Sequence, residues 1–285
     1  MTTWGDARAA ATARLGGGAD PASAPLDATV LLSFALGVSK EALLAHPERT
    51  LSRDEAARFD VLVARRHEGE PVAYLRGWKE FYGLRFRVDP RVLIPRPETE
   101  TLVDEARRAI AGRAAVVADV GTGSGAIACA VAVHERLVRV IGVDASPEAL
   151  AVAEANALAL GVADRVELRE GDLFAPIREQ VDVVCANLPY LRDDALRELA
   201  GDRTSLRYEP RSAVAAGGDG LELIRRAAKD LRRVLAPRGT ALFECDPPQA
   251  AEVARLLAGN GLRTTVVRDL AGSERVVRGD LESAQ

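Results

Sequence analysis

From residue 115 onward, short apolar runs that are typical of buried strands alternate with amphipathic helical segments. The first five runs are residues 115–120, 138–143, 166–168, 181–186 and 240–245. Strands that alternate with helices form a parallel sheet covered on both faces, because each strand needs a crossover to reach the same edge. The last two runs, residues 262–267 and 274–277, are joined by a link too short for such a crossover. We therefore predict an α/β fold whose mostly parallel seven-stranded sheet ends in one antiparallel hairpin.

The part of the chain before this sheet has a helical pattern, with apolar residues three and four positions apart. Ser52-Arg53-Asp54-Glu55 has the pattern of a capping box, which marks the start of a helix. The alternating stretch from Phe81 to Ile94, with a turn signal at Asp89-Pro90, indicates a hairpin or a pair of short strands. The sequence thus predicts three parts: a small helical bundle at residues 1–75, a β-hairpin connector at residues 76–96 and the α/β domain at residues 97–285.

The composition excludes several classes of protein. The formal net charge of −4 and a pI near 5.6 give no chain-wide basic surface, so we expect no direct nucleic-acid partner. Cys129, Cys185 and Cys245 lie far apart in apolar runs, which favours buried thiols over a disulfide or a metal site. The N-terminus lacks the pattern of a signal peptide, and no run approaches the ~18 apolar residues of a membrane span. We expect a cytoplasmic protein with no metal and no membrane partner.

A glycine-rich turn, Gly121-Thr122-Gly123-Ser124-Gly125, follows the first strand predicted for the α/β domain. Glycines allow a ligand to approach the backbone closely at the carboxyl edge of the sheet, where open α/β sheets bind ligands. Asp144 ends the next strand about twenty residues further on, where a carboxylate can accept hydrogen bonds from both hydroxyls of a ribose. Because the turn also fits the loose dinucleotide pattern, by itself it predicts only a cofactor that contains a nucleoside.

Two further carboxylates bear on the identity of that cofactor. Asp119 lies just before the glycines, and a carboxylate there favours S-adenosylmethionine, a cationic ligand without a pyrophosphate. Asp172 follows the third strand and is a candidate acceptor for the adenine amine, although a helix or turn cap would explain it as well.

The strand at residues 181–186 runs directly into Asn187-Leu188-Pro189-Tyr190. An amide or exocyclic amino nitrogen is a poor nucleophile because its lone pair is delocalised. Two acceptors that hold both of its hydrogens would orient it for methyl transfer and stabilise the charge that develops. The side-chain oxygen of Asn187 and the backbone carbonyl of Leu188, in a turn shaped by Pro189, supply such a pair, which we call the amide clamp. Tyr190 can lie flat on the planar target group.

Further motifs extend over nearly the whole chain. They are found at residues 71–75, 92–100, 208–211, 217–221 and 269–272. With the DVGTGSGAIA loop and the amide clamp, they resemble the protein-(glutamine) methyltransferases that modify the glutamine of the Gly-Gly-Gln motif in peptide chain release factors. The predicted sheet likewise has the outline of the class I S-adenosylmethionine-dependent methyltransferase fold.

The resemblance has consequences for the site and for the partner. In that family the segment Ile94-Pro95-Arg96-Pro97-Glu98-Thr99-Glu100 lies beside the cofactor, and the helical N-terminal part helps to recognise the release factor. Motifs and resemblance together predict a catalytic group of Asn187, Leu188, Pro189 and Tyr190. The predicted cofactor-binding residues are Arg96, Glu98, Thr99, Asp119, Gly121, Thr122, Gly123, Ser124, Gly125, Asp144, Ala145, Asp172, Leu173 and Asn187.

The chain departs from the family pattern at two places. Most members have proline where this chain has Leu188, and since the clamp needs only that residue's carbonyl, we expect it to be retained. The segment Glu244–Gln249 is richer in proline than in relatives, with no consequence evident from the sequence.

Other functions fit parts of the pattern. Asn-Leu-Pro-Tyr is typical of ribosomal RNA adenine methyltransferases, so an adenine-N6 methyltransferase acting on RNA or DNA is the alternative. The acidic pI and residues 94–100 weigh against it. A nicotinamide-dependent oxidoreductase would need only the glycine turn and Asp144, and would leave residues 187–190 without a role. A non-catalytic binding module would have no need to keep the clamp.

Overall fold

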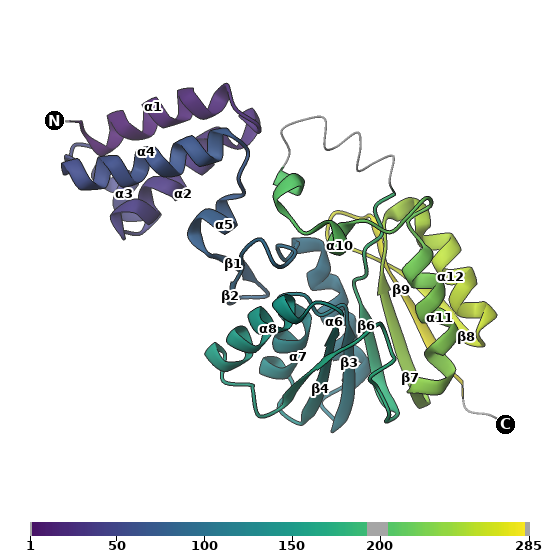
Figure 1. The fold of residues 1–285 in the computed structure, drawn as a ribbon. Coiled ribbons are helices and arrows are strands. Elements are labelled where there is room, and N and C mark those ends of the chain that lie inside the picture. The colour runs from purple at the N-terminus through teal and green to yellow at the C-terminus, as the bar shows by residue number, and fades with distance from the viewer. Residues whose placement is uncertain (1, 193–204, 283–285) are drawn as a thin grey trace. The chain divides into compact units, whose positions relative to one another are not determined.

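The computed structural model describes residues 2–192 and 205–282 (Figure 1). Its internal contacts divide the chain into two compact units. The first unit contains residues 2–78 and 205–209, and the second contains the other described residues.

The first unit is a helical bundle. Its helices are α1 (Trp4–Gly16), α2 (Ala24–Leu36), α3 (Lys40–Ala45), α4 (Arg53–His67) and α5 (Val72–Arg76), with short 3-10 turns η1 (Pro21–Ser23) and η3 (Ser205–Tyr208). The predicted capping box is confirmed: Ser52 Oγ accepts a hydrogen bond from the Glu55 N–H at 3.2 Å, and Glu55 Oε2 accepts from the Ser52 N–H at 2.8 Å. Buried residues from several helices, including Trp4, Leu32 and Phe59, form the core of the bundle.

A two-stranded hairpin follows, formed by β1 (Trp78–Phe81) and β2 (Leu84–Arg87). Its turn lies at Tyr82-Gly83, where both residues have positive φ angles of 53° and 70°. The turn signal at Asp89-Pro90 marks a separate tight turn further on, closed by a hydrogen bond of 3.1 Å from the Val92 N–H to the Asp89 carbonyl.

The second unit is built on a seven-stranded sheet with the order β5-β4-β3-β6-β7-β9-β8. The strands are β3 (Ala115–Val120), β4 (Val138–Asp144), β5 (Val166–Glu170), β6 (Val181–Ala186), β7 (Leu235–Glu244), β8 (Leu262–Arg268) and β9 (Glu274–Leu281). All neighbours are parallel except β9, which is antiparallel to both β7 and β8. This confirms the predicted mostly parallel sheet with a C-terminal antiparallel hairpin.

Helices cover both faces of this sheet (Figure 1). They are α6 (Glu100–Ile110), α7 (Ala126–His134), α8 (Pro147–Ala159), α11 (Glu222–Val234) and α12 (Ala250–Gly259). The short helix α10 (Arg211–Val214) and the 3-10 turns η2 (Pro97–Thr99) and η4 (Pro247–Gln249) belong to the connecting segments. Along β6 the side chains alternate between two cores: Val183 and Cys185 pack with α6 and α7, whereas Val184 and Ala186 pack with α11 and α12. Cys129, Cys185 and Cys245 are buried free thiols, as predicted. Among the described residues, no helix is both long enough and apolar enough to cross a membrane.

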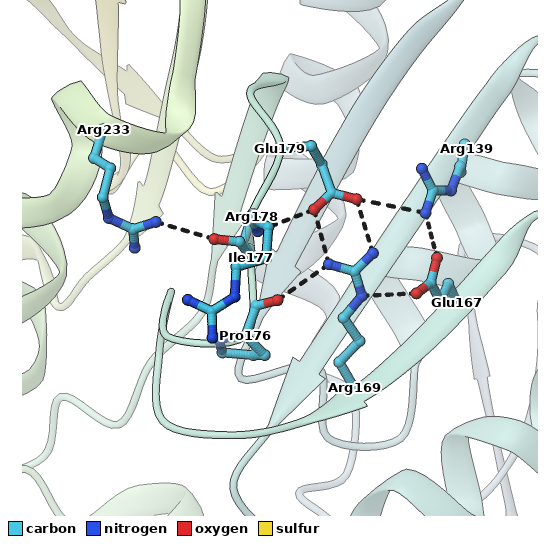
Figure 2. Close-up of polar contacts among 8 residues, drawn as sticks. All are labelled: Arg139, Glu167, Arg169, Pro176, Ile177, Arg178, Glu179 and Arg233. Carbon is cyan, nitrogen blue, oxygen red and sulfur yellow. Dashed lines mark hydrogen bonds and ion pairs between the residues drawn. The ribbon is translucent and has the colours of Figure 1, made fainter.

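Strand β5 forms one edge of the sheet and carries a charged network (Figure 2). Arg169 donates to Glu167 at 2.8 Å and makes two hydrogen bonds to Glu179, at 2.9 and 2.8 Å. Arg139 on the neighbouring strand β4 pairs with both carboxylates. Charged side chains on an edge strand discourage pairing with another chain, so the network protects this edge from aggregation.

Candidate active site

The site lies where the strand order reverses. The chain proceeds from β3 outward through β4 to β5 and then returns to β6, on the other side of β3. Val120 and Ala186, the last residues of β3 and β6, are register partners, so Gly121 and Asn187 leave the sheet side by side at its carboxyl edge. Ligands bind at such switch points in open α/β sheets because the loops on either side separate there.

The glycine turn has the backbone geometry that its sequence indicates. Gly121 and Gly125 both have φ angles of 75°, a left-handed conformation that favours glycine. A Cβ atom at Gly121 would lie 3.1 Å from Leu188 Cδ2, and one at Gly125 would lie 3.1 Å from the Ala153 Cβ. The turn is thus pressed against its neighbours, and its N–H groups at Gly121 and Thr122 donate to the Val143 carbonyl at 2.8 and 2.9 Å.

A cavity of about 450 Å³ lies over this turn. The predicted site residues that line it are Gly121, Gly123, Asp144, Ala145, Asp172, Leu173, Asn187, Leu188 and Pro189. Its volume is within the range of about 300–1,000 Å³ that is usual for small-ligand sites.

Asp144 is held in place at the wall of this cavity. Its Oδ2 accepts a hydrogen bond from the Gly123 N–H at 2.9 Å, and its Oδ1 accepts one from the Ser146 N–H at 3.0 Å. Each carboxylate oxygen has further acceptor capacity, so the group can still receive hydroxyl donors from a ligand.

Asp119 lies beneath the turn instead of lining the cavity. It is fully buried, and its Oδ2 accepts from Thr122 Oγ1 at 2.6 Å and from the Ala128 N–H at 3.1 Å. Its Oδ1 is buried and has no hydrogen-bond partner within the described residues. Burial raises the pKa of this carboxyl to about 6, although the hydrogen bonds from Thr122 and Ala128 act to lower it. Asp119 therefore ties the turn to the start of α7.

Several predicted cofactor-binding residues also lie outside the cavity lining. Thr122 and Ser124 are buried within the turn, and Thr99, at the end of η2, is 4% exposed. Arg96, Glu98, Gly125 and Tyr190 do not line the cavity either.

Asp172 reaches the cavity but is already paired. Its carboxylate forms an ion pair with Arg226 of α11, and its side chain is exposed. A ligand amine at this position would have to share the carboxylate with Arg226.

The amide clamp begins directly after β6. Asn187 Nδ2 donates a hydrogen bond to Thr99 Oγ1 at 3.1 Å, across 88 positions of the chain. Within the described residues, neither Asn187 Oδ1 nor the Leu188 carbonyl takes part in a hydrogen bond. Both predicted acceptors are therefore available at the cavity.

Leu188, which replaces the proline of the family pattern, has a packing role in this chain. Its side chain is 3% exposed and belongs to the core between the sheet and helices α11 and α12. Its Cδ2 is the atom that comes closest to a Cβ at Gly121. The leucine thus packs the clamp against the glycine turn.

Tyr190 points into a polar cluster. Its hydroxyl lies 3.4 Å from Oε1 of Glu244, at the end of β7. Burial, and secondly the Glu244 charge, raise the pKa of the Tyr190 phenol above its usual range. Burial likewise raises the pKa of Glu244 to about 7, opposed by Thr99, Arg275 and Tyr190.

The second departure from the family pattern also has a structural role. Gln249 Nε2 donates to the Tyr190 carbonyl at 3.1 Å and to the Asp219 carbonyl at 3.3 Å. Gln249 and Asp246 form a capping box that starts η4. The proline-rich segment therefore fixes the exit of the clamp.

Sequence reasoning missed part of the cavity wall. One missed part of the wall follows the hairpin and consists of Arg91, Val92 and Leu93. The other comes from the start of α10, with Pro210, Ser212 and Ala213, and from α11, with Leu223. The signal was partly present, since Val92, Leu93 and Pro210 lie in motifs that carry the family resemblance.

The fold and this site define a class I methyltransferase. The PrmC N-terminal domain model matches residues 6–77, and the Methyltransferase small domain model matches residues 98–206. The ribosomal protein L11 methylase of Lactobacillus delbrueckii subsp. bulgaricus, whose structure has a TM-score of 0.50, is 22% identical and covers 70% of this chain and 86% of its own.

Sequence relatives narrow the class to one family. The release factor glutamine methyltransferase of Cereibacter sphaeroides is 40% identical over 281 residues, covering 98% of this chain and 99% of the relative. That of Bordetella pertussis is 42% identical over 267 residues, covering 92% and 97%. The chain belongs to the release factor glutamine methyltransferases.

Proposed function

We propose that this protein transfers a methyl group from S-adenosylmethionine to the side-chain amide nitrogen of the glutamine in the Gly-Gly-Gln motif of peptide chain release factors. The observation that carries the proposal is the pair of available acceptors, Asn187 Oδ1 and the Leu188 carbonyl, beside the glycine turn. Its relatives are named for the same activity.

The residues of the cavity fit the proposed cofactor. The left-handed glycines at Gly121 and Gly123 expose the backbone, and Asp144 offers acceptor capacity for ribose hydroxyls. Asp144, a carboxylate in the cavity wall, suits a cationic ligand. When bound, S-adenosylmethionine would supply an electrophilic methyl group on a sulfonium, with S-adenosylhomocysteine as the leaving group.

The clamp makes an unreactive nitrogen into an acceptor of that methyl group. A carboxamide NH₂ has two donors, and the clamp has two acceptors that emerge from consecutive residues. Holding both hydrogens fixes the plane of the amide and aligns its nitrogen. The same two oxygens stabilise the positive charge that grows on nitrogen during transfer, which is when their contribution counts most. No general base is required, because the proton can leave after methylation.

We assign the remaining roles as follows. Catalysis and cofactor binding belong to residues 97–285, the hairpin at residues 76–96 connects the parts, and the helical bundle at residues 1–75 contributes to recognition of the release factor. Because release factors act in translation termination, we place the activity in the cytoplasm.

The decisive experiment uses S-adenosylmethionine with a labelled methyl group. The protein is incubated with a release factor, with the same factor carrying glutamate in place of the motif glutamine, or with ribosomal RNA. Label is expected only on the intact release factor, at the glutamine of the Gly-Gly-Gln motif. Label on an adenine of the RNA, with none on the release factor, would establish the adenine-N6 alternative instead.

The Asn187→Ala variant tests the clamp itself. Turnover is expected to fall about 10²- to 10³-fold, the effect of removing one oriented polar group that stabilises developing charge. Cofactor binding, measured by calorimetry, is expected to remain close to wild type. Asn260→Ala is the matched control, because Asn260 caps the end of α12 and its Nδ2 donates only to the Leu256 carbonyl. Unchanged turnover in Asn187→Ala would refute the clamp.

A further inference from the structure

We propose that Thr99 is a positioning residue, whose hydroxyl accepts a hydrogen bond from the Asn187 side chain and thereby sets the orientation of that side chain. This inference rests on the proposed function, since it explains how one oxygen of the amide clamp comes to face the substrate. It also changes the role of Thr99, which the sequence places among the cofactor-binding residues.

The first observation is the place of Thr99. It ends the short turn η2, is 4% exposed and does not line the cavity. Its Oγ1 accepts a hydrogen bond from Asn187 Nδ2 at 3.1 Å. Thr99 therefore contacts Asn187 of the clamp without forming part of the cavity wall.

The second observation concerns the proton of the Thr99 hydroxyl. A hydroxyl has one proton to donate and two lone pairs to accept with. Glu244 is fully buried at the end of β7. Burial raises the pKa of its carboxyl to about 7, and a hydrogen bond from the Thr99 hydroxyl to the charged carboxylate opposes that rise. While the Thr99 hydroxyl donates its proton to the charged Glu244 carboxylate, its oxygen accepts from Asn187 Nδ2.

This arrangement selects one of two orientations of the Asn187 amide. A carboxamide rotated by 180° has nearly the same shape, but its oxygen and its NH₂ group exchange places. With Thr99 as acceptor, the NH₂ group of Asn187 faces Thr99 and Oδ1 faces the other way. In the flipped orientation, Asn187 would turn its NH₂ group toward the substrate NH₂ group, which also has only donors, and the clamp would keep only the Leu188 carbonyl as an acceptor.

Of the other groups around Glu244, Arg275 and the Tyr190 hydroxyl favour the charged carboxylate, whereas Glu98 opposes it. Arg275 of β9 stabilises the charged carboxylate, the Tyr190 hydroxyl lies 3.4 Å from its Oε1, and Glu98 of η2 is the nearby group of like charge. Glu244 Oε2 is buried and has no hydrogen-bond partner within the described residues.

A pair of variants separates the hydroxyl from the shape of the side chain. Thr99→Val keeps the branched shape without the hydroxyl, and Thr99→Ser keeps the hydroxyl. For Thr99→Val, kcat for release factor methylation is expected to fall about tenfold or more, the value for one net hydrogen bond of about 1.4 kcal/mol. The dissociation constant of S-adenosylmethionine, measured by calorimetry, is expected to stay within about twofold. Thr99→Ser is expected to restore kcat to near wild type.

A second readout does not depend on activity. The side-chain amide signals of Asn187 are assigned in a nitrogen–proton correlation spectrum by their loss in Asn187→Ala. They are expected to shift in Thr99→Val and to stay close to wild type in Thr99→Ser. If the wild type failed to methylate a release factor while these shifts occurred, the proposed function would fall and the positioning role would stand.

Two results would overturn the inference. One is a Thr99→Val variant with wild-type kcat and unshifted Asn187 signals. The other is a Thr99→Val variant whose only defect is weaker cofactor binding, which would return Thr99 to the cofactor site.

Discussion

The buried carboxyl of Asp119 is expected to make the stability of the protein fall as the pH rises. Its pKa of about 6 lies above the value of 3.8 that applies when it is exposed, and burial is the main cause. Between these two values the folded protein keeps a proton that the unfolded chain releases. The stabilising contribution is therefore fully present below pH 3.8 and is lost as the pH rises through about 6.

The size of the effect follows from the shift. A difference of about 2 pKa units corresponds to about 3 kcal/mol, of which about 2 kcal/mol falls between pH 4.5 and pH 8. Asp119→Asn cannot ionise, and its side-chain oxygen can still accept from Thr122 and Ala128 at the position of Oδ2. Its NH₂ group would occupy the place of the unpartnered Oδ1, which lowers stability at every pH without changing the slope.

The assay is urea unfolding followed by circular dichroism at pH 4.5, 6 and 8. Tryptophan fluorescence would not serve, because Trp4 and Trp78 both belong to the first unit. Between pH 4.5 and pH 8, the free energy of unfolding of Asp119→Asn is expected to fall by about 2 kcal/mol less than that of the wild type. Glu167→Gln is the control: Arg169 and Arg139 hold the pKa of Glu167 at about 2, so its effect is confined below pH 4.5 (Figure 2). Equal slopes for wild type and Asp119→Asn would refute the reasoning.

Three further variants test the turn and the bundle. Gly121→Ala and Gly123→Ala both place alanine at positive φ, which costs roughly 1–2 kcal/mol, but only the former meets Leu188 at 3.1 Å. Gly121→Ala is therefore expected to lower the free energy of unfolding, measured in urea, and the affinity for S-adenosylmethionine, measured by calorimetry, more than Gly123→Ala does. Equal losses in the two variants would exclude the contact with Leu188 as the cause. Ser52→Ala removes the cap of α4 and is expected to cost about 1 kcal/mol in thermal unfolding, with a change near zero arguing against the capping box.

Local patterns were sufficient to predict the strands of the sheet, but not the hairpin turn. The runs at β3 and β6 are continuous and apolar because both faces of a parallel sheet are buried, and that signal lies in the sequence itself. Tyr82 occupies a left-handed turn position with φ 53°, which a bulky residue disfavours. Its backbone N–H donates to Glu100 and its hydroxyl donates to Asp104, so distant residues hold it there. No local pattern could have indicated those contacts.

The site was predictable to the extent that its residues follow strands. Gly121, Asp144 and Asn187 each come directly at or after the end of a strand, and the topology brings those ends to one edge. The support beneath them was not predictable. Thr99 contacts Asn187, and Glu244 contacts Tyr190, only after the chain has folded. In the sequence, Thr99 belongs to a proline-rich linker and Glu244 to an ordinary strand end.

Leu188 belongs at once to the apolar layer beneath α11 and α12 and to the wall of the cavity. Because the interior is closely packed, changes of volume in that layer are expected to shift Leu188 relative to the glycine turn. Substitutions in this layer, although distant from the cavity, are therefore expected to alter catalysis. Buried positions of α11 and α12 should accept fewer changes of side-chain size than those of α6 and α7, whose layer does not include Leu188.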